Sequence, residues 1–480
     1  MTKKLFFSAI AFCFAWQAFA GGLLTNTNQS VHFLRNPARD ASTEIDAVYT
    51  NPAGLSLLPV DGFHFALTNQ SAFQTREITT TYAPFKGFGG NDTKTFKGEA
   101  SAPIVPSVQA AYKKGDWVLS GSIAVTGGGG KATFNEGLPS FESQIAMVPV
   151  GLNMAGIPTT LYSVDSYMEG SSFIYGAQLG GTYKINDLFS AYAGFRMNIV
   201  NNSYVGHLKD IKINPEYSAV GFTGTMISAE TVFNTLAAVY TAQGNVDGAK
   251  EMKDNAEAVA DKYLDCDQSG WGVTPVLGLN FNWNALNVGV KYEFRTNLNV
   301  ENKTKIDDTG LFKHGVNTPH DIPSLLTVGV QYDIIPAITV SAGYHRFFDS
   351  NASMALVTDP YTGNKVGKEN FIDGGTNEYL GGVEWRIDRL FLISGGFQFT
   401  RYGISDEYQQ DLSFSLNSYS VGIGGAVNVS ERVRVNIGYF FTNYSDWTKE
   451  SANYNGTSMP GKDVFSRTNK VFGAGVDFRF

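Results

Sequence analysis

The sequence is poor in cysteine, in charged residues and in long apolar runs, and each shortage excludes a class of protein. Its 480 residues contain two cysteines, Cys13 and Cys266, so a disulfide-rich fold is excluded. Charged residues make up 17% of the chain, whereas an average soluble protein has roughly 25%. No apolar run reaches the roughly 18 residues that a membrane-spanning helix needs. These shortages argue against an ordinary soluble protein and against a bundle of membrane helices.

Glycine and aromatic residues are abundant instead. The chain has 52 glycines, 35 phenylalanines and 23 tyrosines. The glycines show no three-residue period, which excludes a collagen-like chain, and the many aromatic and β-branched residues exclude a disordered one. The composition therefore favours a β-rich protein.

The first twenty residues have the pattern of a secretory signal peptide. Lys3 and Lys4 precede an apolar stretch over residues 5–16, and an Ala-x-Ala site ends at Ala20. The stretch is too short for a membrane anchor, and Phe12 stands before Cys13 where a lipoprotein site needs a small residue. We expect residues 1–20 to be removed.

Removal of that segment leaves a mature chain with 34 basic and 44 acidic residues, a formal charge of -10. This balance disfavours nucleic acid as a partner, because phosphate binding needs a basic surface. Cys266 then has no second cysteine to pair with, and we expect it to be an unpaired thiol in a loop.

From about residue 60 onward, apolar and polar side chains alternate in successive segments. In the last segment Phe472, Val476 and Phe480 fall on one face, whereas Asp477 and Arg479 fall on the other. A strand places successive side chains on opposite faces, so each segment predicts a strand with one apolar face. The fourteen predicted strands are 60–82, 99–113, 116–126, 173–184, 188–200, 271–283, 286–298, 322–333, 336–348, 378–387, 390–401, 416–429, 432–445 and 467–480.

The connections between these strands alternate between short turns and long polar insertions. The largest insertions cover residues 127–172 and 201–270. This asymmetry, together with the even number of strands, is typical of a bacterial outer-membrane barrel. Trp117, Trp283 and Trp385 lie beside short turns and Trp271 and Trp447 at the ends of long loops, as expected for aromatic girdles at the membrane interfaces. We therefore predict an all-β fold, a fourteen-stranded antiparallel transmembrane barrel over residues 60–480, whose apolar face meets lipid and whose interior is polar.

Residues 21–59 show no sustained alternation. Two Asn-Pro steps, Asn36-Pro37 and Asn51-Pro52, favour turns and caps over a strand. Two interpretations stay open from composition alone, a plug inside the barrel and a disordered periplasmic tail.

The stretch from Ala41-Ser42 to Asn51-Pro52-Ala53-Gly54-Leu55 resembles the N-terminal hatch of the FadL-type transporters, which carry long-chain fatty acids and other hydrophobic compounds across the outer membrane. The resemblance covers the whole mature chain, including the terminal Phe480. It implies a hatch over residues 21–59 that plugs the barrel and loosens on ligand binding, with Asn51, Pro52 and Ala53 as its gating residues. It also implies lateral release of the ligand into the bilayer near a kink in the third strand.

The third strand is followed by four glycines, Gly127, Gly128, Gly129 and Gly130, which weaken strand pairing and permit a sharp bend. Following the resemblance, we place the lateral opening near them. A flexible loop beginning at the same residues is the alternative.

Basic residues on the polar faces are candidates for binding a ligand carboxylate, which resists entering lipid. They are Arg196, Lys291, Arg295, Arg386 and Arg434. The alternative is that these cations pair across the barrel with Glu293, Glu384 or Asp477.

One insertion has helical periodicity. Val232, Phe233 and Leu236 share one face, and Met252, Ala256 and Val259 share another, which predicts a helical hairpin over residues 228–264 in an extracellular loop. His314 and His320 flank a turn-rich loop, where we expect them to be solvated. The six histidines have no metal-binding spacing, and no nucleophile motif occurs. We therefore predict neither a metal, nor a cofactor, nor enzyme activity.

These observations together predict a monomeric channel in the outer membrane of a Gram-negative bacterium. Its expected partners are hydrophobic small molecules, foremost long-chain fatty acids taken up passively, and the lipid of the outer membrane. A general diffusion porin and a structural or adhesive barrel are the alternatives.

Overall fold

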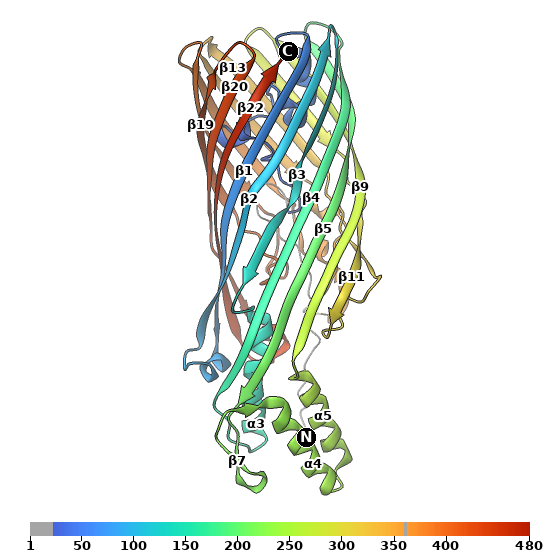
Figure 1. The fold of residues 1–480 in the computed structure, drawn as a ribbon, viewed down its shortest axis with the longest axis vertical. Helices are drawn as coiled ribbons and strands as arrows, with labels where there is room; N and C mark the ends of the chain where they lie inside the picture. The colour runs from blue at the N-terminus through green and yellow to red at the C-terminus, as the bar shows by residue number, and fades with distance from the viewer. Residues whose placement is uncertain (1–22, 360–361) are drawn as a thin grey trace.

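The computed structural model describes residues 23–359 and 362–480. The predicted signal peptide, residues 1–20 with Cys13, lies outside the described residues. Within the described chain, fourteen strands form a closed wall in which every neighbouring pair is antiparallel, and the last strand pairs with the first (Figure 1). The predicted fold class is confirmed.

The wall strands have the following bounds: β1 Gly62–Tyr82, β2 Thr93–Lys114, β3 Trp117–Phe134, β4 Tyr162–Lys184, β5 Phe189–Ile213, β9 Lys262–Trp283, β10 Leu286–Glu293, β13 Leu325–Ile335, β14 Ile338–Phe347, β17 Asn377–Arg386, β18 Phe391–Arg401, β19 Ser418–Asn428, β20 Val433–Tyr444 and β22 Gly461–Arg479. Short strands lie in the long connections: β6 Glu216–Tyr217, β7 Phe222–Thr223, β8 Ile227–Ser228, β11 Asn299–Asp307, β12 Asn317–Pro319, β15 Leu356–Thr358, β16 Lys365–Gly367 and β21 Trp447–Ser451.

The alternation of side chains separates an apolar outside from a polar inside. On β19 and β20, Ile423 and Ile437 are 56% and 60% exposed, whereas the inward Asn436 is fully buried. Soluble proteins rarely expose apolar patches larger than a few hundred Å², and here apolar side chains cover the outer face of strand after strand. Such a surface is stable against acyl chains, so the polar face encloses the lumen.

Short turns and long connections lie at opposite ends of the barrel. The short turns, such as residues 115–116, 284–285 and 336–337, lie at the same end as the C-terminus, whereas helices α3, α4 and α5 lie at the other end (Figure 1). In outer-membrane barrels the short turns face the periplasm and the long loops face the exterior.

Several strands are longer than predicted and extend beyond the lipid-facing band. β5 has 25 residues, about 80 Å at the rise of a strand, whereas the apolar band is about 25 Å tall. Outside that band the outer face no longer meets lipid, while inward side chains such as Met168, Tyr204 and Leu264 pack in a buried apolar cluster, so the pattern of an apolar outer face and a polar inner face on which the prediction depended is lost. Two placements were therefore wrong: Trp271 and Cys266 lie within β9 rather than in or beside a loop, and Cys266 is buried.

The helices lie in the N-terminal segment and in the extracellular connections. They are α1 Val31–Arg35, α2 Ala47–Thr50, α3 Pro139–Met154, α4 Ala229–Ala242 and α5 Val246–Ala258, with 3-10 turns η1 Pro52–Leu57, η2 Ala83–Gly87, η3 Ser218–Val220, η4 Asp349–Asn351, η5 Lys368–Phe371 and η6 Tyr454–Gly456. Ser228 caps α4 and Asn245 caps α5, which form the two arms of an extracellular hairpin. None of the helices in the described residues is long and apolar enough to cross a membrane.

Residues 23–58, named the hatch from here on, lie inside the barrel. All of them are buried except the partly exposed Thr43, Glu44 and Leu57. The structure therefore agrees with the interpretation that this segment lies inside the barrel, and not with a periplasmic tail.

Candidate functional site: a plugged lumen with a gap in its wall

The hatch backbone lies directly against the barrel wall because glycines line the wall at its level. The glycines that face the hatch come from consecutive strands: Gly278, Gly289, Gly329, Gly343, Gly382, Gly396, Gly422, Gly438 and Gly473. A Cβ added at Gly329 would lie 2.6 Å from the carbonyl carbon of Asp40, and one at Gly422 would lie 2.4 Å from the Leu34 carbonyl oxygen. Contacts this short do not occur between non-bonded atoms, so a side chain at these positions would displace the hatch.

The motif Asn51-Pro52-Ala53 fastens the end of the hatch to the wall. Asn51 donates from Nδ2 to the Ser42 carbonyl at 3.0 Å and to Oδ1 of Asn280 at 2.8 Å. The carbonyl oxygens of Pro52 and Ala53 accept hydrogen bonds at 2.7 Å from Thr182 and Ser190. Because Pro52 begins a 3-10 turn, where its missing N–H leaves no bond unmade, the motif turns the chain and ties it to three strands.

A cluster of charged side chains holds the opposite side of the hatch. Arg39 donates to both carboxylate oxygens of Asp46 at 2.7 Å, and Arg35 bonds Glu384 of β17 at 2.6 Å. Glu44 accepts from Arg39 at 2.8 Å and from Arg434 of β20 at 2.5 Å. The hatch and the wall are therefore joined by buried, charge-assisted hydrogen bonds.

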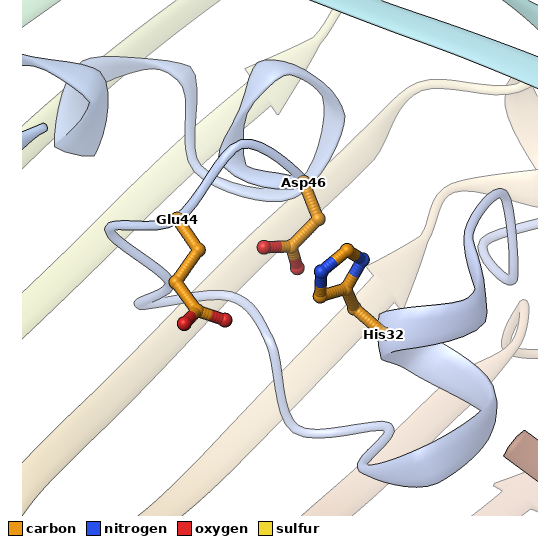
Figure 2. Close-up of side chains that lie close together, drawn as sticks. All are labelled: His32, Glu44 and Asp46. Atoms are coloured by element: carbon orange, nitrogen blue, oxygen red, sulfur yellow. The ribbon is translucent and has the colours of Figure 1, made fainter. Parts of the chain in front are cut away.

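His32, Glu44 and Asp46 come together within this cluster (Figure 2). Their potential ligand atoms all lie within 4.8 Å of one another, which is close enough for a metal ion. However, guanidinium groups of Arg39 and Arg434 already neutralise the two carboxylates, and His32 bonds Asp477 at 3.0 Å. A cation would have to displace these arginines, so the arrangement fits an ion-pair network better than a metal site.

Burial and the arginines act in opposite directions on these two acids. Burial alone would raise the pKa of Glu44, but Arg434, Arg39 and Arg35 hold that pKa well below its usual range. Burial likewise opposes ionisation of Asp46, and the charge and hydrogen bonds of Arg39 lower its pKa below the usual value. Both hatch carboxylates are therefore ionised at neutral pH.

A second anchor joins Asp40 of the hatch to β14. Nε2 of His345 lies 2.9 Å from Oδ1 of Asp40, and its Nδ1 lies 2.7 Å from Glu378 on β17. All three side chains are buried. Arg35, Arg39 and Asp40 flank the Asn36-Pro37 step, but no local pattern in the sequence indicates that they contact the wall.

Two of the predicted cations, Arg196 and Lys291, lie together beneath the hatch. Both bond the carboxylate of Glu293, Lys291 at 2.7 Å, as the pairing alternative anticipated. Lys291 also donates to the Tyr49 carbonyl at 2.9 Å. Nζ of Lys291 lies 4.1 Å from the centre of the Tyr49 ring, and the Arg196 guanidinium lies 5.2 Å from it. Tyr49 of the hatch thus covers both cations.

The other three predicted cations occupy different places. Arg295 lies just beyond β10 and Arg386 is the last residue of β17. Their side chains are both 42% exposed, and they donate to the carbonyls of Asn351 and Pro336, respectively. Arg386 is also 3.6 Å from Glu384. Arg434 belongs to the hatch cluster through Glu44. The structure does not bring the five cations together into one site.

The pairing of β2 with β3 is interrupted in the middle of the wall. It runs to Ser101 and Lys131 and resumes at Val108 and Ile123, which leaves residues 102–107 and 124–130 outside the described ladder. Pro103 and Pro106 lie in the β2 part of this gap, and proline has no N–H to donate to a neighbouring strand. This interruption of the β2–β3 ladder is called the gap from here on.

The four glycines lie on the other side of this gap. The third strand was predicted to end at 126, which was wrong: it continues to Phe134, and the glycines form a bulge within it. Gly128 has a φ of +88° and Gly130 one of +73°, values that residues with a Cβ rarely adopt. The four glycines show no alternation of apolar and polar side chains, so the sequence pattern did not indicate that the strand continues through them.

The N-terminal part of the hatch covers the gap from inside. The Asn26 backbone N–H donates to the Thr126 carbonyl at 2.8 Å, and its side chain reaches the Gly128 carbonyl at 3.3 Å. On the other edge Ser107 of β2 donates to the Gln29 carbonyl, and Gln70 of the next strand, β1, donates to the Asn28 carbonyl, both at 2.6 Å. Residues 26–29 are thus hydrogen-bonded to both edges of the gap.

An apolar cavity lies at the extracellular end, between α3 and the extended strands. Its volume is about 220 Å³. Apolar side chains line most of it: Phe141, Ile145, Met168, Leu208, Leu264 and Leu311. His207 and Lys262 are the basic residues of its lining. His320, which we expected to be solvated, is buried, whereas His314 is exposed as predicted.

Comparisons with known proteins agree with this architecture. No protein-family model matches the sequence, and no curated protein matches it. The structure is similar to that of a Pseudomonas aeruginosa FadL homologue, with a TM-score of 0.63 and 12% identity over 96% of this chain and 100% of that one. It is also similar to the Pseudomonas putida toluene transporter TodX, with a TM-score of 0.55 and 15% identity over 97% of this chain and 100% of that one. For the Ralstonia pickettii toluene transporter TbuX the TM-score is 0.52, with 13% identity over 93% of this chain and 98% of that one.

At these identities the likeness is one of fold. The chain has the FadL-type fold, which confirms the resemblance proposed from the hatch motif. The barrel and its neighbours indicate an outer-membrane protein, and the neighbours are transporters rather than enzymes.

Proposed function

We propose that this protein is an outer-membrane channel for the passive uptake of hydrophobic compounds, with long-chain fatty acids as its leading substrate. The hatch would act as the gate, and the ligand would leave sideways through the gap between β2 and β3, beside Gly127, Gly128, Gly129 and Gly130. The similar structures of a FadL homologue and two toluene transporters support the hydrophobic class of substrate.

The observation that carries this proposal is the gap in the β2–β3 ladder with the hatch bonded across it. A gap that opened permanently would leave backbone groups without partners inside the membrane, which is costly. Here Asn26 bonds the backbone carbonyls of Thr126 and Gly128, and wall side chains bond the carbonyls of residues 28 and 29, each bond with a net contribution of about 0.5–1.5 kcal/mol. Displacement of this short stretch would therefore be a modest step that opens an exit in the wall.

The two ends of the hatch would have different roles in this mechanism. Asn51, Pro52 and Ala53 are tied to β4, β5 and β9 and would act as the fixed anchor around which the gate moves. Residues 26–29 would be the moving part. A ligand carboxylate would reach Lys291 and Arg196 once Tyr49 shifts, because that ring covers both cations in the closed state.

A reversible cross-link tests whether the hatch must move. The side chains of Asn28 and Gln70 are neighbours, 3.5 Å apart, so cysteines at both positions would tie the hatch to β1. Cys266→Ser in the background removes the native thiol. The matched control joins two wall strands, β1 and β2, away from the hatch through cysteines at Thr79 and Thr95, which are cross-strand partners with hydroxyl oxygens 2.9 Å apart.

We expect the oxidised N28C/Q70C protein to lose uptake of radiolabelled oleate in cells without another fatty-acid transporter, and to recover it on reduction. The oxidised T79C/T95C control should transport normally. Normal uptake by the oxidised N28C/Q70C protein would contradict gating by the hatch.

A further inference from the structure

We propose that Arg346, Asn377 and Arg401, named the arginine row from here on, bind a lipid phosphate on the outer face of the barrel. The occupant would be a phosphorylated glycolipid, the class of lipid that forms the outer leaflet of bacterial outer membranes. The inference goes beyond the proposed function, because it concerns the surface that meets lipid and not the lumen. It rests on the placement of the barrel in the outer membrane.

The arginine row crosses three neighbouring strands. Arg346 of β14 is the cross-strand partner of Asn377 of β17, and Asn377 is the partner of Arg401 of β18. The adjacent His345 and Glu378 are buried on the inner face, so the row faces outward. Neighbouring strands lie about 4.7–4.9 Å apart, which places the two arginines about 10 Å from each other along the row. Their long side chains can converge on one group above Asn377.

A row of aromatic side chains lies two residues closer to the periplasmic end on the same outer face. Successive cross-strand partners on β14, β17, β18 and β19 form it: Tyr344, Tyr379, Phe399 and Tyr419. The last three of them are 46–51% exposed. Exposed aromatic rings gather where the headgroups of a membrane meet its acyl chains. The aromatic row therefore marks the interface of the outer leaflet.

The arginine row lies just beyond the apolar band, at the level of the headgroups. On β17, Trp385 is exposed near the short turn at the periplasmic end, as a residue of the opposite aromatic girdle would be. Between Trp385 and Tyr379 only Gly381 and Val383 face outward. Acyl chains therefore cover the stretch between the two rings, and Asn377 is the first outward polar residue above it.

The arginine row carries positive charge that no described ion pair neutralises. In the part of the chain that the structure describes, neither guanidinium group forms an ion pair. Arg346 donates to Oδ1 of Asn377 at 3.0 Å. Asp349 is close enough to feel the charge of Arg346, but it is buried and accepts from the Thr376 backbone N–H at 2.6 Å. The outward charge of the row is thus complementary to an anion in the membrane.

The donors of the arginine row suit a phosphate. The planar fork of arginine matches phosphate oxygens, and arginine is less strongly hydrated than lysine. The Tyr344 hydroxyl donates to Oδ1 of Asn377 at 2.7 Å, as Arg346 does, which leaves Nδ2 of Asn377 as a further donor between the arginines. The described acceptor of that Nδ2 is the Gly375 carbonyl, 3.5 Å away.

The aromatic row decides between a lipid and a free phosphate ion. Its exposed rings offer apolar surface to acyl chains directly below the phosphate donors. A free phosphate ion would gain nothing from these rings, whereas a lipid contacts both rows at once. The surface therefore fits a lipid whose phosphate lies at the arginine row and whose chains lie along the aromatic row.

Binding of lipid A, the phosphorylated glycolipid anchor of lipopolysaccharide, to the purified protein tests the site. Native mass spectrometry would compare lipid A with the same lipid lacking its phosphates, in the presence of a chelator that removes bridging cations. Inorganic phosphate serves as a competitor. The test variant is R346Q/R401Q. The matched control, R389Q/R432Q, removes two exposed arginines from short turns at the opposite end of the barrel.

We expect the wild type and the control to bind lipid A about tenfold more tightly than its dephosphorylated form, since arginines near anionic headgroups favour binding. R346Q/R401Q should lose this preference and bind the dephosphorylated lipid as the wild type does. An unchanged preference in R346Q/R401Q, or no preference in the wild type, would overturn the proposal. Displacement of lipid A by an equal concentration of inorganic phosphate would indicate a site for the free ion and would also overturn it.

A wild-type experiment covers the case in which the glutamine variant does not fold, which the gel shift between boiled and unboiled samples would reveal. Lipid A with a photoreactive group beside its phosphate should label peptides that contain Arg346, Asn377 or Arg401. Labelling confined to other strands would contradict the site. Uptake of oleate is measured separately, so failure of the lipid site leaves the channel function standing, and failure of uptake leaves the lipid site standing.

Discussion

Gly329 is in contact with the hatch at a place where only hydrogen fits. The main chain of Asp40 and Ala41 lies so close that an added Cβ would be 2.6 Å from one atom and 2.7 Å from another. The same holds at glycines on neighbouring strands, where the nearest atoms again belong to the hatch. These glycines therefore allow the backbone of the hatch to pack directly against the barrel wall.

We expect Gly329→Ala to push the hatch away from its seat at a cost of about 1–3 kcal/mol, as overpacking of a tight contact does. Such a change raises the open fraction about tenfold or more, because 1.4 kcal/mol corresponds to one factor of ten. Recordings of channel opening in planar bilayers would detect it. Gly395→Ala is the matched control, since that glycine is on the outer face of β18 with no neighbouring atom closer than 3.5 Å. Equal behaviour of the two variants would contradict this role of Gly329.

At the residue scale the sequence predicted which side chains face inward but not which of them meet. Lys291 and Arg434 were placed in the lumen by alternation alone, and both are there. The contacts between Asp40 and His345, and between Glu44 and Arg434, join residues 305 and 390 positions apart. Their meeting depends on strand register and barrel closure, which no local pattern encodes.

At the scale of elements, the hatch depends on charges that stay ionised over a wide range of pH. The pKa of Glu44 is well below its usual range and that of Asp46 is lowered too, because the arginines outweigh the effect of burial. A lowered folded-state pKa gives a stabilisation that is fully present above the ordinary pKa and is lost as the pH falls through the folded-state value. The hatch should therefore remain seated in mildly acidic solution.

We expect the channel to stay closed in planar bilayers between pH 7 and about 5, and to open only well below the ordinary glutamate pKa of about 4.3. Glu44→Gln should open more often at pH 7, because it removes charge-assisted bonds that contribute about 1.5–3 kcal/mol each. Opening of the wild type on acidification from pH 7 to 5 would show that these carboxylates do not hold the hatch.

The strands show where element prediction succeeded and where it failed. Alternation identified all fourteen wall strands because one face of each meets lipid. It missed the extensions of β4, β5 and β9, where the outer face no longer meets lipid and the inner face packs in apolar clusters, and it ended β3 at the glycine bulge. Helices α4 and α5 fall within the predicted hairpin because their 3.6-residue period is independent of the barrel.

At the scale of the whole molecule, the barrel has an apolar outer face and a polar lumen that contains the hatch, and these two features bear on which solutes it would transport. Ions and sugars need an open aqueous bore, whereas residues 23–58 lie buried inside this barrel. An apolar cavity lies at the extracellular end, and the β2–β3 ladder is interrupted in the wall. The proposed channel for hydrophobic solutes therefore differs from a general porin in a property that can be measured directly.

That property is the ionic conductance of single proteins in planar bilayers, compared between the full mature chain and a variant lacking residues 23–58. The full chain should show no steady current, and the shortened one, once its heat-dependent gel shift confirms a folded barrel, should show large and steady currents. A steady current through the full chain, or no current through the folded shortened variant, would contradict the claim that the hatch closes the lumen of the barrel.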